Sequence, residues 1–516
     1  MTHEASLSEG PVFRRLEAEL PESARMIILY NPRSSAARKP ILPMSLLALG
    51  AVLEGHEDYL IVDGNIEPRP LQQLDRQIRE TGAAVLGVTV MPGPQLDDAV
   101  PLCRELKIRH PTLQIVWGGY FPTQHVATCL QAPFVDFVVR GHGELVFRDL
   151  VGELTRGAEP TERIGVAYRD RQTDHVVDSG LSRIPHPERL PSFPYHRVDM
   201  SRYIRRTFMG DRTIPHHSSY GCPFFCNFCA VVNMVNGAWL PQSAERTAGT
   251  VHELVDRFGV NAVEFYDNNF FVHEDRTVEF AERIRPLGIG WWGEARVDTL
   301  LKSSERTWRL LTASGLRMVY LGAESGSDAT LQRMRKGGTA SADKTLEIAA
   351  LMKSHGIVPE FSFVVGNPPD PEDDARQTLA FIRKLKRINP ASEIVMYLYT
   401  PVPLQGNLYE QATAAGFRFP NTLEEWTSSS WREFSQRRSG TLPWIEEPLR
   451  RELHDFERVL NAYYPTVTDR GLTRAARVVL HAASAWRYRL RWYRYPLELR
   501  LLQRLLPYQR PETSGF

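Results

Sequence analysis

Cysteine is scarce in this sequence, with five residues in a chain of 516. So few thiols, in an odd number, argue against a disulfide framework of the kind that holds small secreted domains together. Net charge is almost absent too: 62 lysine and arginine residues stand against 61 aspartate and glutamate residues, a balance of +1. This balance gives no general reason to expect nucleic acid as a partner, and we expect none.

Long apolar runs are also missing. No stretch reaches about 18 uninterrupted apolar residues, so a membrane-spanning helix is not expected. Residues 1–24 form a polar leader that lacks the apolar segment of a secretory signal. We therefore expect a cytoplasmic protein, and a length of 516 residues predicts two or three domains.

Short apolar runs alternate with helical segments over residues 25–155. This alternation predicts an α/β, doubly wound (Rossmann-like) domain built on a parallel sheet. Ligands of such sheets lie beyond the carboxyl ends of the strands, and glycine-containing loops follow three of the predicted strands. These loops contain Asp63-Gly64-Asn65, Met91-Pro92-Gly93 and Gly118-Gly119. No G-x-G-x-x-G follows the first strand, so a dinucleotide ligand is disfavoured.

The rest of the chain divides into three parts. Residues 156–210 are proline-rich with weak periodicity, and they predict a linker. Residues 211–410 contain six predicted strands separated by amphipathic helices, which indicates a partial (β/α)₆ barrel rather than a full eight. We place five of these strands at 262–267, 289–296, 318–325, 360–366 and 393–400, and the sixth just before Cys222. Residues 411–516 predict a mostly helical region.

Three of the five cysteines, Cys222, Cys226 and Cys229, follow the pattern C-x3-C-x2-C. Thiolates at this spacing can hold three irons of a cubane [4Fe–4S] cluster and leave the fourth iron without a protein ligand. A structural zinc site is an alternative, because His216 and His217 are close enough in sequence to supply a fourth ligand. Three buried cysteines without a metal are a further alternative.

The cysteine pattern, with Phe228 before the third cysteine, resembles the signature of the radical S-adenosylmethionine (SAM) superfamily. The loop at Asp267, the strand end at Glu324-Ser325 and the strand end at Gly366 resemble later motifs of the same superfamily. The resemblance implies that SAM chelates the open iron and is cleaved there to a 5′-deoxyadenosyl radical. It also implies that these later residues contact SAM.

Glu294, Arg296 and Glu324 lie at or near the carboxyl ends of predicted barrel strands, where active sites of barrels collect. A guanidinium there can pair with the carboxylate of SAM, and a carboxylate can accept hydrogen bonds from its ribose or ammonium group. Ordinary salt bridges at strand ends are the alternative.

The N-terminal half resembles the cobalamin-binding domain that precedes many radical SAM enzymes. The resemblance rests on the β/α pattern and on two motifs, and it implies cobalamin contacts at Gly118, Gly119, Gly141, Gly143 and Glu144. The cobalamin-dependent mutases and methionine synthase carry Asp-x-His-x-x-Gly, whose histidine binds cobalt. The loop that we match to it, Asp63-Gly64-Asn65, has no histidine. Cobalamin would then bind without a histidine ligand to cobalt, with Met91-Pro92-Gly93 facing its lower side. A domain that has lost its ligand is the alternative.

Two such cofactors imply a radical C-methyltransferase. One SAM would supply the radical that abstracts hydrogen from an unreactive carbon, and a second would methylate cob(I)alamin, which then delivers the methyl group. The substrate would be a small or lipid-like molecule, and a flavodoxin or ferredoxin would supply electrons. The anaerobic oxidative cyclase of chlorophyll synthesis, which does not methylate, has the same parts and is the main alternative. A cobalamin or Fe–S sensor is the non-enzyme alternative.

The C-terminal run from Ser484 to Arg510 is basic and aromatic, with leucines at helical spacing. It is compatible with peripheral contact to a membrane surface. An amphipathic helix packed on the barrel, with its arginines facing solvent, explains the same pattern. Cys103 and Cys129 lie in or near predicted helices and are expected to be small buried residues.

Overall fold

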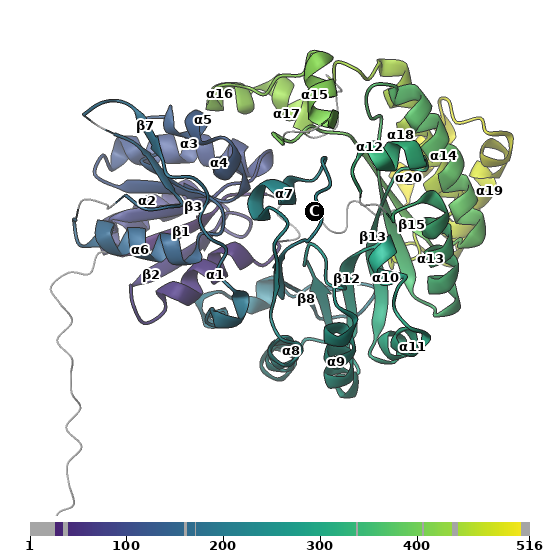
Figure 1. Cartoon of the computed structure of the whole chain (residues 1–516), viewed down its shortest axis with the longest axis horizontal. Helices are drawn as coiled ribbons and strands as arrows, with labels where there is room; N and C mark the ends of the chain where they lie inside the picture. Colours follow the sequence, from purple (N-terminus) through teal and green to yellow (C-terminus); the bar gives the residue numbers. More distant parts are fainter. Residues whose placement is uncertain are drawn as a thin grey trace, which may run out of the picture.

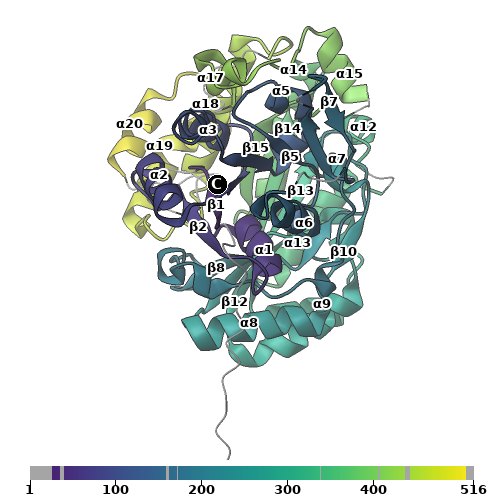
Figure 2. The same cartoon turned by 90° about the vertical axis from the view of Figure 1, so that its left-hand side faces the viewer.

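The computed structural model describes residues 26–34, 40–158, 162–170, 172–336, 339–404, 407–435 and 442–506. The polar leader predicted at 1–24 lies outside these residues. Figure 1 shows an N-terminal α/β domain beside a larger α/β unit, with green helices of the C-terminal region running over the top of both. Seen from its own side, the N-terminal domain lies in front of the strands of the larger unit (Figure 2).

The N-terminal domain is a seven-stranded sheet in the order β2-β1-β3-β4-β5-β6-β7. β1 to β5 run parallel, and a separate apolar core lies on each face of the sheet. Its elements are β1 (Ile27–Asn31), α1 (Met44–Leu53), β2 (Tyr59–Asp63), α2 (Pro70–Thr81), β3 (Val85–Thr89), α3 (Pro94–Arg109), β4 (Gln114–Gly118), α4 (Tyr120–Gln124), α5 (Val126–Leu130), β5 (Phe137–Val139), α6 (Glu144–Thr155), β6 (Val166–Arg169) and β7 (Val176–Asp178). The strand order reverses between β1 and β3, so the ligand crevice is expected at that edge.

The seven-stranded sheet continues past residue 155, the boundary that the sequence predicts for this domain. β6 and β7, which we assigned to the linker 156–210, extend the sheet as two antiparallel strands. β7 is a mostly exposed edge strand and lacks the continuous apolar run by which a buried parallel strand is recognised. Only the stretch after β7, with its 3₁₀ turns, connects the domains: η1 (Pro187–Arg189), η2 (Tyr195–Arg197) and η3 (Met200–Arg202).

The second domain is an open barrel of six parallel strands in the order β15-β14-β13-β12-β11-β8, which confirms the partial (β/α)₆ prediction. The strand directly before Cys222, β9, pairs instead with β10 in a separate two-stranded sheet, so β8 is the first barrel strand. The elements are β8 (Thr213–His216), β9 (Ser219–Gly221), α7 (Ala230–Val235), β10 (Trp239–Pro241), α8 (Ala244–Phe258), β11 (Ala262–Phe265), α9 (Glu274–Ile284), η4 (Arg285–Leu287), β12 (Gly290–Arg296), α10 (Val297–Leu300), α11 (Glu305–Ala313), β13 (Leu316–Glu324), α12 (Asp328–Arg333), α13 (Ala342–Ser354), β14 (Val358–Val365), α14 (Pro371–Ile388) and β15 (Glu393–Leu398).

The C-terminal region is helical, as predicted. It contains α15 (Asn407–Ala414), α16 (Leu423–Trp426), α17 (Ser429–Ser435), α18 (Glu447–Tyr463), α19 (Arg474–Leu490) and α20 (Leu497–Leu505). The last three pack on the barrel and share its apolar core. Among the residues that the structure describes, none of the helices is both long and apolar enough to cross a membrane.

The helices α16 and α17 of the C-terminal region pack against the N-terminal domain. The Trp426 ring lies 4.9 Å from that of Phe121 and 4.7 Å from that of His125, and Trp426 belongs to the apolar core of the N-terminal sheet. At the rim, Arg432 Nε donates to Asp97 Oδ2 at 3.0 Å. The C-terminal region thus packs on both domains at once.

Candidate functional site

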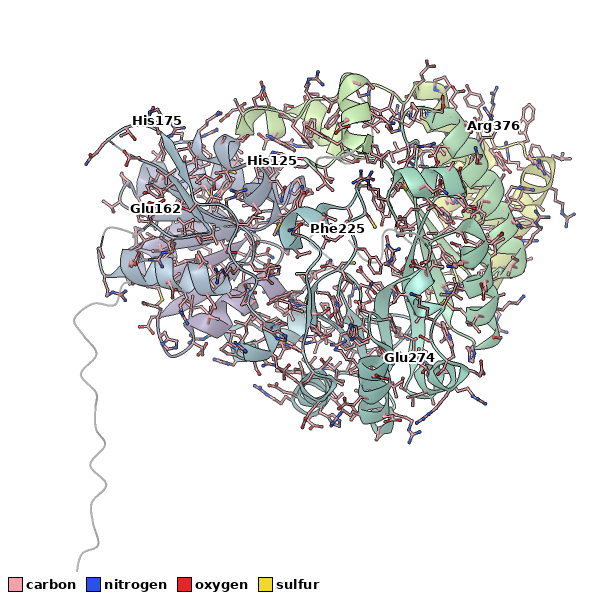
Figure 3. All side chains as sticks on the ribbon, in the orientation of Figure 1. His125, Glu162, His175, Phe225, Glu274 and Arg376 are labelled. Atoms are coloured by element: carbon pink, nitrogen blue, oxygen red, sulfur yellow. The ribbon has the colours of Figure 1, made fainter. Side chains whose placement is uncertain are left out.

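The three motif cysteines lie on one short loop between β9 and α7. The second is buried, the other two are half-buried, and all three are free thiols. The backbone N–H of Asn227 donates to Met334 O at 3.1 Å and its side-chain amide to Arg333 O at 2.7 Å. These bonds fasten the loop to the end of α12. Figure 3 places Phe225, which belongs to this loop, between the two domains.

Two cationic side chains lie against the cysteine loop. Arg296 Nη1 donates to Cys226 Sγ at 3.4 Å, and its guanidinium carbon is 3.8 Å from the centroid of the Phe224 ring. Lys336 Nζ is 5.7 Å from the centroid of the Phe228 ring. Metal binding requires thiolates, and nearby cations stabilise their negative charge.

Burial raises the pKa of Cys222 and raises that of Cys229 to about 11, so these two side chains are thiols rather than thiolates without a metal. Beside Cys222, Asn269 is fully buried, and its side-chain amide interacts with the Cys222 thiol and has no other hydrogen-bond partner within the described residues. A buried amide with unmet hydrogen-bonding capacity is costly, so a polar group bound there is favoured. Three soft sulfur donors, two cations and this buried amide fit an iron–sulfur cluster with a polar ligand beside it.

The histidines of the zinc alternative point elsewhere. His216 is buried between aromatic rings, 5.8 Å from Phe193 and 6.1 Å from Phe265, and burial lowers its pKa to about 3. His217 lines a cavity of the N-terminal domain. Within the described ranges no group of three or more His, Cys, Asp or Glu side chains is arranged to hold a single metal ion. The geometry therefore favours the cluster over zinc.

Near the cysteine loop, Lys336 forms a buried ion pair with Glu324 at the end of β13. Ser362 Oγ on β14 donates to the other carboxylate oxygen of Glu324 at 3.5 Å. Glu324 has a φ of +64°, a left-handed conformation that a non-glycine residue adopts at a cost of about 1–3 kcal/mol. Such strain collects at functional sites. The sequence analysis does not identify Lys336 as a site residue, because Lys336 follows no predicted strand. Its position after the short helix α12 is the only local signal that could have indicated it.

A cavity of 340 Å³ lies at the carboxyl ends of β3, β4 and β5, closed on one side by α1. Its walls are mostly apolar, and His217 and Tyr220 of the second domain complete it. Burial lowers the pKa of both His142 and His217, so both rings are neutral near pH 7 and each can donate and accept one hydrogen bond. The cavity suits a large, mostly apolar ligand with a few polar groups.

The predicted cobalamin residues divide into two sets. Five of them line the cavity: Gly118, Gly119, Gly141, Gly143 and Glu144. The loop Asp63-Gly64-Asn65 does not, because it follows the edge strand β2. The Asp63 carboxylate accepts hydrogen bonds from Asn31, Asn65 and Tyr203, so it fastens the connection between the domains. Met91-Pro92-Gly93 follows β3 outside the cavity lining, and Met91 is exposed.

Comparison with known proteins agrees with this arrangement. The model of the B12 binding domain matches residues 36–151, and the model of the Radical SAM superfamily matches residues 217–382. The chain is a radical SAM enzyme with a cobalamin-binding domain. Its cofactors are a [4Fe–4S] cluster, SAM and cobalamin.

Relatives of this radical SAM enzyme include an uncharacterised methyltransferase of Pyrococcus horikoshii, 26% identical over 70% of this chain and 78% of the relative. The anaerobic magnesium-protoporphyrin IX monomethyl ester cyclase of Synechocystis is 26% identical over 65% of this chain and 67% of the relative. Among solved structures, the radical SAM methyltransferase TsrM of Kitasatospora setae, with cobalamin and a [4Fe–4S] cluster bound, has a TM-score of 0.58. It is 18% identical, over 73% of this chain and 74% of that one, and shares the fold.

The six residues of the radical SAM domain that we predicted to contact SAM differ in their surroundings. Arg296 and Glu324 lie at the cysteine loop, as described. Ser325 Oγ donates to Asp374 Oδ1 at 3.3 Å, and the Gly366 N–H donates to Asp374 Oδ2 at 3.0 Å. These two residues therefore tie strand ends to α14, and neither offers a free side-chain group.

Asp267 is fully buried, and its carboxylate accepts from the Ser218 N–H and hydroxyl and from the Ser219 hydroxyl. It thus holds β9, immediately before the cysteine loop, and is a positioning residue. We expect Asp267→Ala to lower the free energy of unfolding by about 2–4 kcal/mol, because several buried donors lose their acceptor. Reconstituted cluster content should fall as well. Urea unfolding and iron analysis measure both effects, and Asp256→Ala on the exposed face of α8 should change neither.

Glu294, the remaining predicted contact, lies two residues before Arg296 on β12, in register with Tyr320 of β13. Burial, and secondarily the charge of Asp267, raise the pKa of Glu294 to about 8. Glu360 of β14 is in register with Tyr320 on the other side, and its pKa is also raised, first by burial. The interior face of the barrel thus holds carboxyl groups that are protonated near neutral pH.

The raised pKa of Glu294 predicts a pH-dependent stability. The unfolded chain loses this proton above about pH 4.5, whereas the folded chain keeps it to about pH 8, so rising pH favours unfolding across that window. We expect Glu294→Gln to stabilise the apoprotein by about 1–2 kcal/mol at pH 8.5 and by nothing at pH 4.5. Thermal unfolding at both pH values measures this difference. An equal effect at both, or one shared by the exposed control Glu347→Gln, contradicts the assignment.

The two sites are joined directly. Tyr220, two residues before Cys222, lines the 340 Å³ cavity and donates from its hydroxyl to Glu144 Oε1 at 2.6 Å. On the other side of the loop, the Asn233 amide of α7 donates to Gln124 Oε1 of the N-terminal domain at 2.9 Å. Residues on both sides of the cysteine loop therefore contact the cobalamin-binding domain.

Proposed function

We propose that this enzyme is a cobalamin-dependent methyltransferase that moves a methyl group from SAM to an unactivated carbon of a small or lipid-like molecule. The observation that carries the proposal is the contact between β9, which leads directly into the cysteine loop, and the cavity, through the hydrogen bond from Tyr220 to Glu144. When bound, the cluster and SAM supply a radical for hydrogen abstraction and cobalamin carries the methyl group. A short path between the two sites is what such a transfer needs.

In this proposal Cys222, Cys226 and Cys229 hold three irons of the cluster. Arg296 neutralises thiolate charge, because its guanidinium already donates to Cys226 Sγ. Glu324 and its partner Lys336 form a polar, buried floor beside the loop that can bind the charged groups of SAM. Ser325, Gly366 and Asp267 shape the loops around these groups without contacting a ligand.

Cobalamin would enter the cavity beside α1. The absence of side chains at Gly118 and Gly143 leaves room for the nucleotide tail along the ends of β4 and β5. Gly119 and Gly141 have φ values of +98° and +84°, a region that favours glycine, so they set the backbone of the two strand ends. We propose no histidine ligand to cobalt, and we propose that Met91, which is exposed outside the cavity lining, faces the lower side of the corrin.

Reconstitution under anaerobic conditions tests the function. The protein is incubated with hydroxocobalamin, SAM and a strong reductant, and products are analysed by mass spectrometry. Formation of both 5′-deoxyadenosine and S-adenosylhomocysteine, with cobalamin retained by the chain, is expected. Deoxyadenosine without S-adenosylhomocysteine would move the assignment to a non-methylating enzyme, which the similarity to the anaerobic cyclase supports as second candidate. The absence of deoxyadenosine would instead indicate a sensor.

Turnover requires an electron for the cluster. We propose a flavodoxin or ferredoxin as the external donor and the cytoplasm as the location. Comparison of a reduced flavodoxin and a reduced ferredoxin with dithionite as electron source in the same assay tests the donor. Turnover with dithionite but with neither protein would contradict it.

A further inference from the structure

The outer helical hairpin of the C-terminal region exposes many apolar side chains. In the described part of the chain seventeen large apolar side chains are exposed, and nine of them lie between residues 478 and 505. These nine are Val478, Val479, Trp486, Leu490, Trp492, Tyr495, Leu497, Leu501 and Leu505. The hairpin, α19 and α20, lies at the end of the molecule farthest from the N-terminal domain (Figure 1).

The exposed residues follow helical spacing. On α19, Val478, Trp486 and Leu490 recur at multiples of four residues, so they share a stripe on the solvent side. The inner face of the same helix already buries Leu480 and Tyr488 against α18. α20 repeats the pattern with exposed leucines at 497, 501 and 505. Packing on the barrel therefore explains one face of α19 and leaves the other unexplained.

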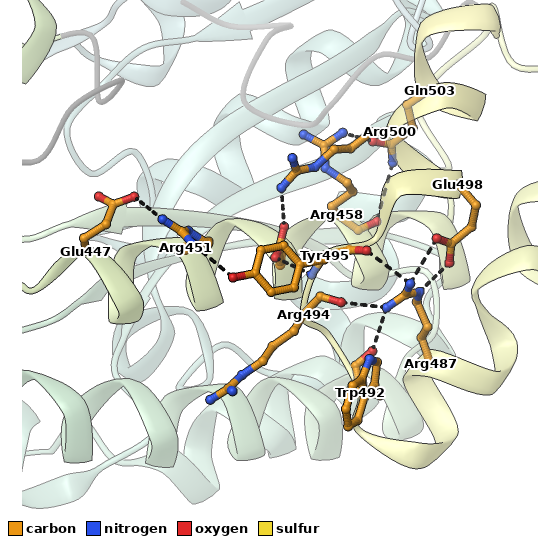
Figure 4. Close-up of polar contacts among 11 residues, drawn as sticks. Glu447, Arg451, Arg458, Arg487, Trp492, Arg494, Tyr495, Glu498, Arg500 and Gln503 are labelled. Atoms are coloured by element: carbon orange, nitrogen blue, oxygen red, sulfur yellow. Dashed lines mark hydrogen bonds and ion pairs between the residues drawn. The ribbon is translucent and has the colours of Figure 1, made fainter.

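Charge is concentrated on this hairpin. Residues 474–506 carry eight arginines and one acidic residue, Glu498, whereas the whole chain has a net charge of +1. Three of the arginines, Arg477, Arg487 and Arg500, bond to the chain itself. The other five are exposed and make no ion pair within the described residues: Arg474, Arg489, Arg491, Arg494 and Arg504. In Figure 4 the guanidinium of Arg494 extends away from the bonded network.

The turn between the two helices is held rigidly. Arg487 is buried, donates to the carbonyls of Arg494 at 2.9 Å and Tyr495 at 3.2 Å, and pairs with Glu498 at 3.0 Å (Figure 4). The Tyr495 N–H donates to Asp455 Oδ2 of α18 at 2.9 Å. Trp492 and Tyr495, as residues 58% and 56% exposed, are thus held at the surface by a fixed backbone, and the Tyr495 hydroxyl accepts a hydrogen bond from Arg451 Nη1 at 3.2 Å.

We propose that the outer face of the α19–α20 hairpin binds the surface of a lipid bilayer that contains anionic lipids. Leucine side chains can enter the acyl boundary, tryptophan and tyrosine favour the headgroup level, and unpaired arginines pair with lipid phosphates. A second copy of the chain would bring five unpaired arginines against five others, which disfavours self-association. A nucleic acid would need the arginines but not the leucines. The proposal is independent of the reaction that the enzyme catalyses.

Cosedimentation of the full-length protein with sonicated vesicles tests the proposal. Vesicles of phosphatidylcholine with 30% phosphatidylglycerol are compared with pure phosphatidylcholine vesicles at low and high salt. The first double variant, Arg489→Glu with Arg494→Glu, removes charge, and each arginine near an anionic surface contributes roughly fivefold in affinity. The second, Trp492→Ser with Leu497→Ser, removes apolar contact. Ile108→Ser and Arg285→Glu, exposed sites on α3 and η4, serve as matched controls.

Binding to the anionic vesicles, reduced at least tenfold by either double variant and by neither control, is the expected result. Equal binding to both kinds of vesicle, or no binding to either, overturns the proposal. A dimer in light scattering that dissociates in the Trp492→Ser, Leu497→Ser variant would assign the surface to self-association instead. All substituted side chains are exposed, so circular dichroism should show the same fold for every variant.

Discussion

Cys226→Ala is expected to abolish the iron–sulfur cluster and, with it, all cleavage of SAM. Cys226 is the buried member of the three cysteines and the one that Arg296 contacts, so no other side chain can take its place. Loss of groups that merely orient a metal ligand costs about 10–100-fold, and loss of a ligand costs more. We expect 5′-deoxyadenosine formation to fall by at least about 100-fold. Iron analysis, the visible absorbance of the cluster and mass spectrometry measure the loss.

The other two cysteines provide the control. Cys103 and Cys129 are both fully buried in the apolar core of the N-terminal domain, where burial raises the pKa of each thiol. Cys103→Ala and Cys129→Ala should each cost about 1 kcal/mol of stability and leave iron content unchanged. A Cys226→Ala protein that keeps a full cluster, or a control that loses it, would contradict the assignment of the ligands.

Gly118→Leu is expected to reduce cobalamin binding at least tenfold while leaving the cluster in place. A Cβ atom placed on Gly118 would lie 3.8 Å from its nearest neighbour, Val139 O, so a side chain there would cause no steric clash with the backbone. It would extend into the cavity that Gly118 lines. It would occupy space that the proposal reserves for the nucleotide tail. The cobalamin retained after gel filtration, read by absorbance, measures the effect, and iron content measures the cluster in the same sample.

A leucine at another open glycine separates this effect from general damage. Gly249, within α8, has no neighbouring atom within 4 Å of the position that a Cβ would take, and it is not among the residues that line the cavity. Gly249→Leu should retain cobalamin like the unchanged protein. If Gly118→Leu also retains it, the cavity is not the cobalamin site and the role of the five residues lining it has to be revised.

Most of the fold could be predicted because β1 to β5 of the first sheet and all six barrel strands are parallel and largely buried. Such strands read as short apolar runs, as in residues 27–30 or 85–88, and they are too short to be confused with helices. The carboxyl ends of these strands then place Arg296 and Glu324 near the cysteines without knowledge of side-chain contacts. The cysteine spacing is local, so it needs no tertiary structure to be recognised.

What the sequence did not reveal depends on contacts between distant segments. Whether a polar residue at a strand end faces a ligand or a neighbouring loop is decided by its partners, and Asp63 and Asp267 both hold the backbone. Lys336 reaches the site from the end of a helix, and Tyr220 contacts Glu144 across the domain boundary. None of these pairings leaves a periodic signal in the chain.

The packing of Trp426 into the N-terminal sheet limits how this protein can be recombined. Because α16 and α17 come from the far end of the chain yet complete the core of the first domain, the two catalytic units are not exchangeable modules. A chimera that takes residues 26–178 from a relative would have to take the matching segment around 419–432 with them. Without it, Phe121 and His125 would lose their aromatic cover, and the grafted domain would expose part of its core. Exchange of the N-terminal domain of this protein therefore requires that two separate segments be exchanged together.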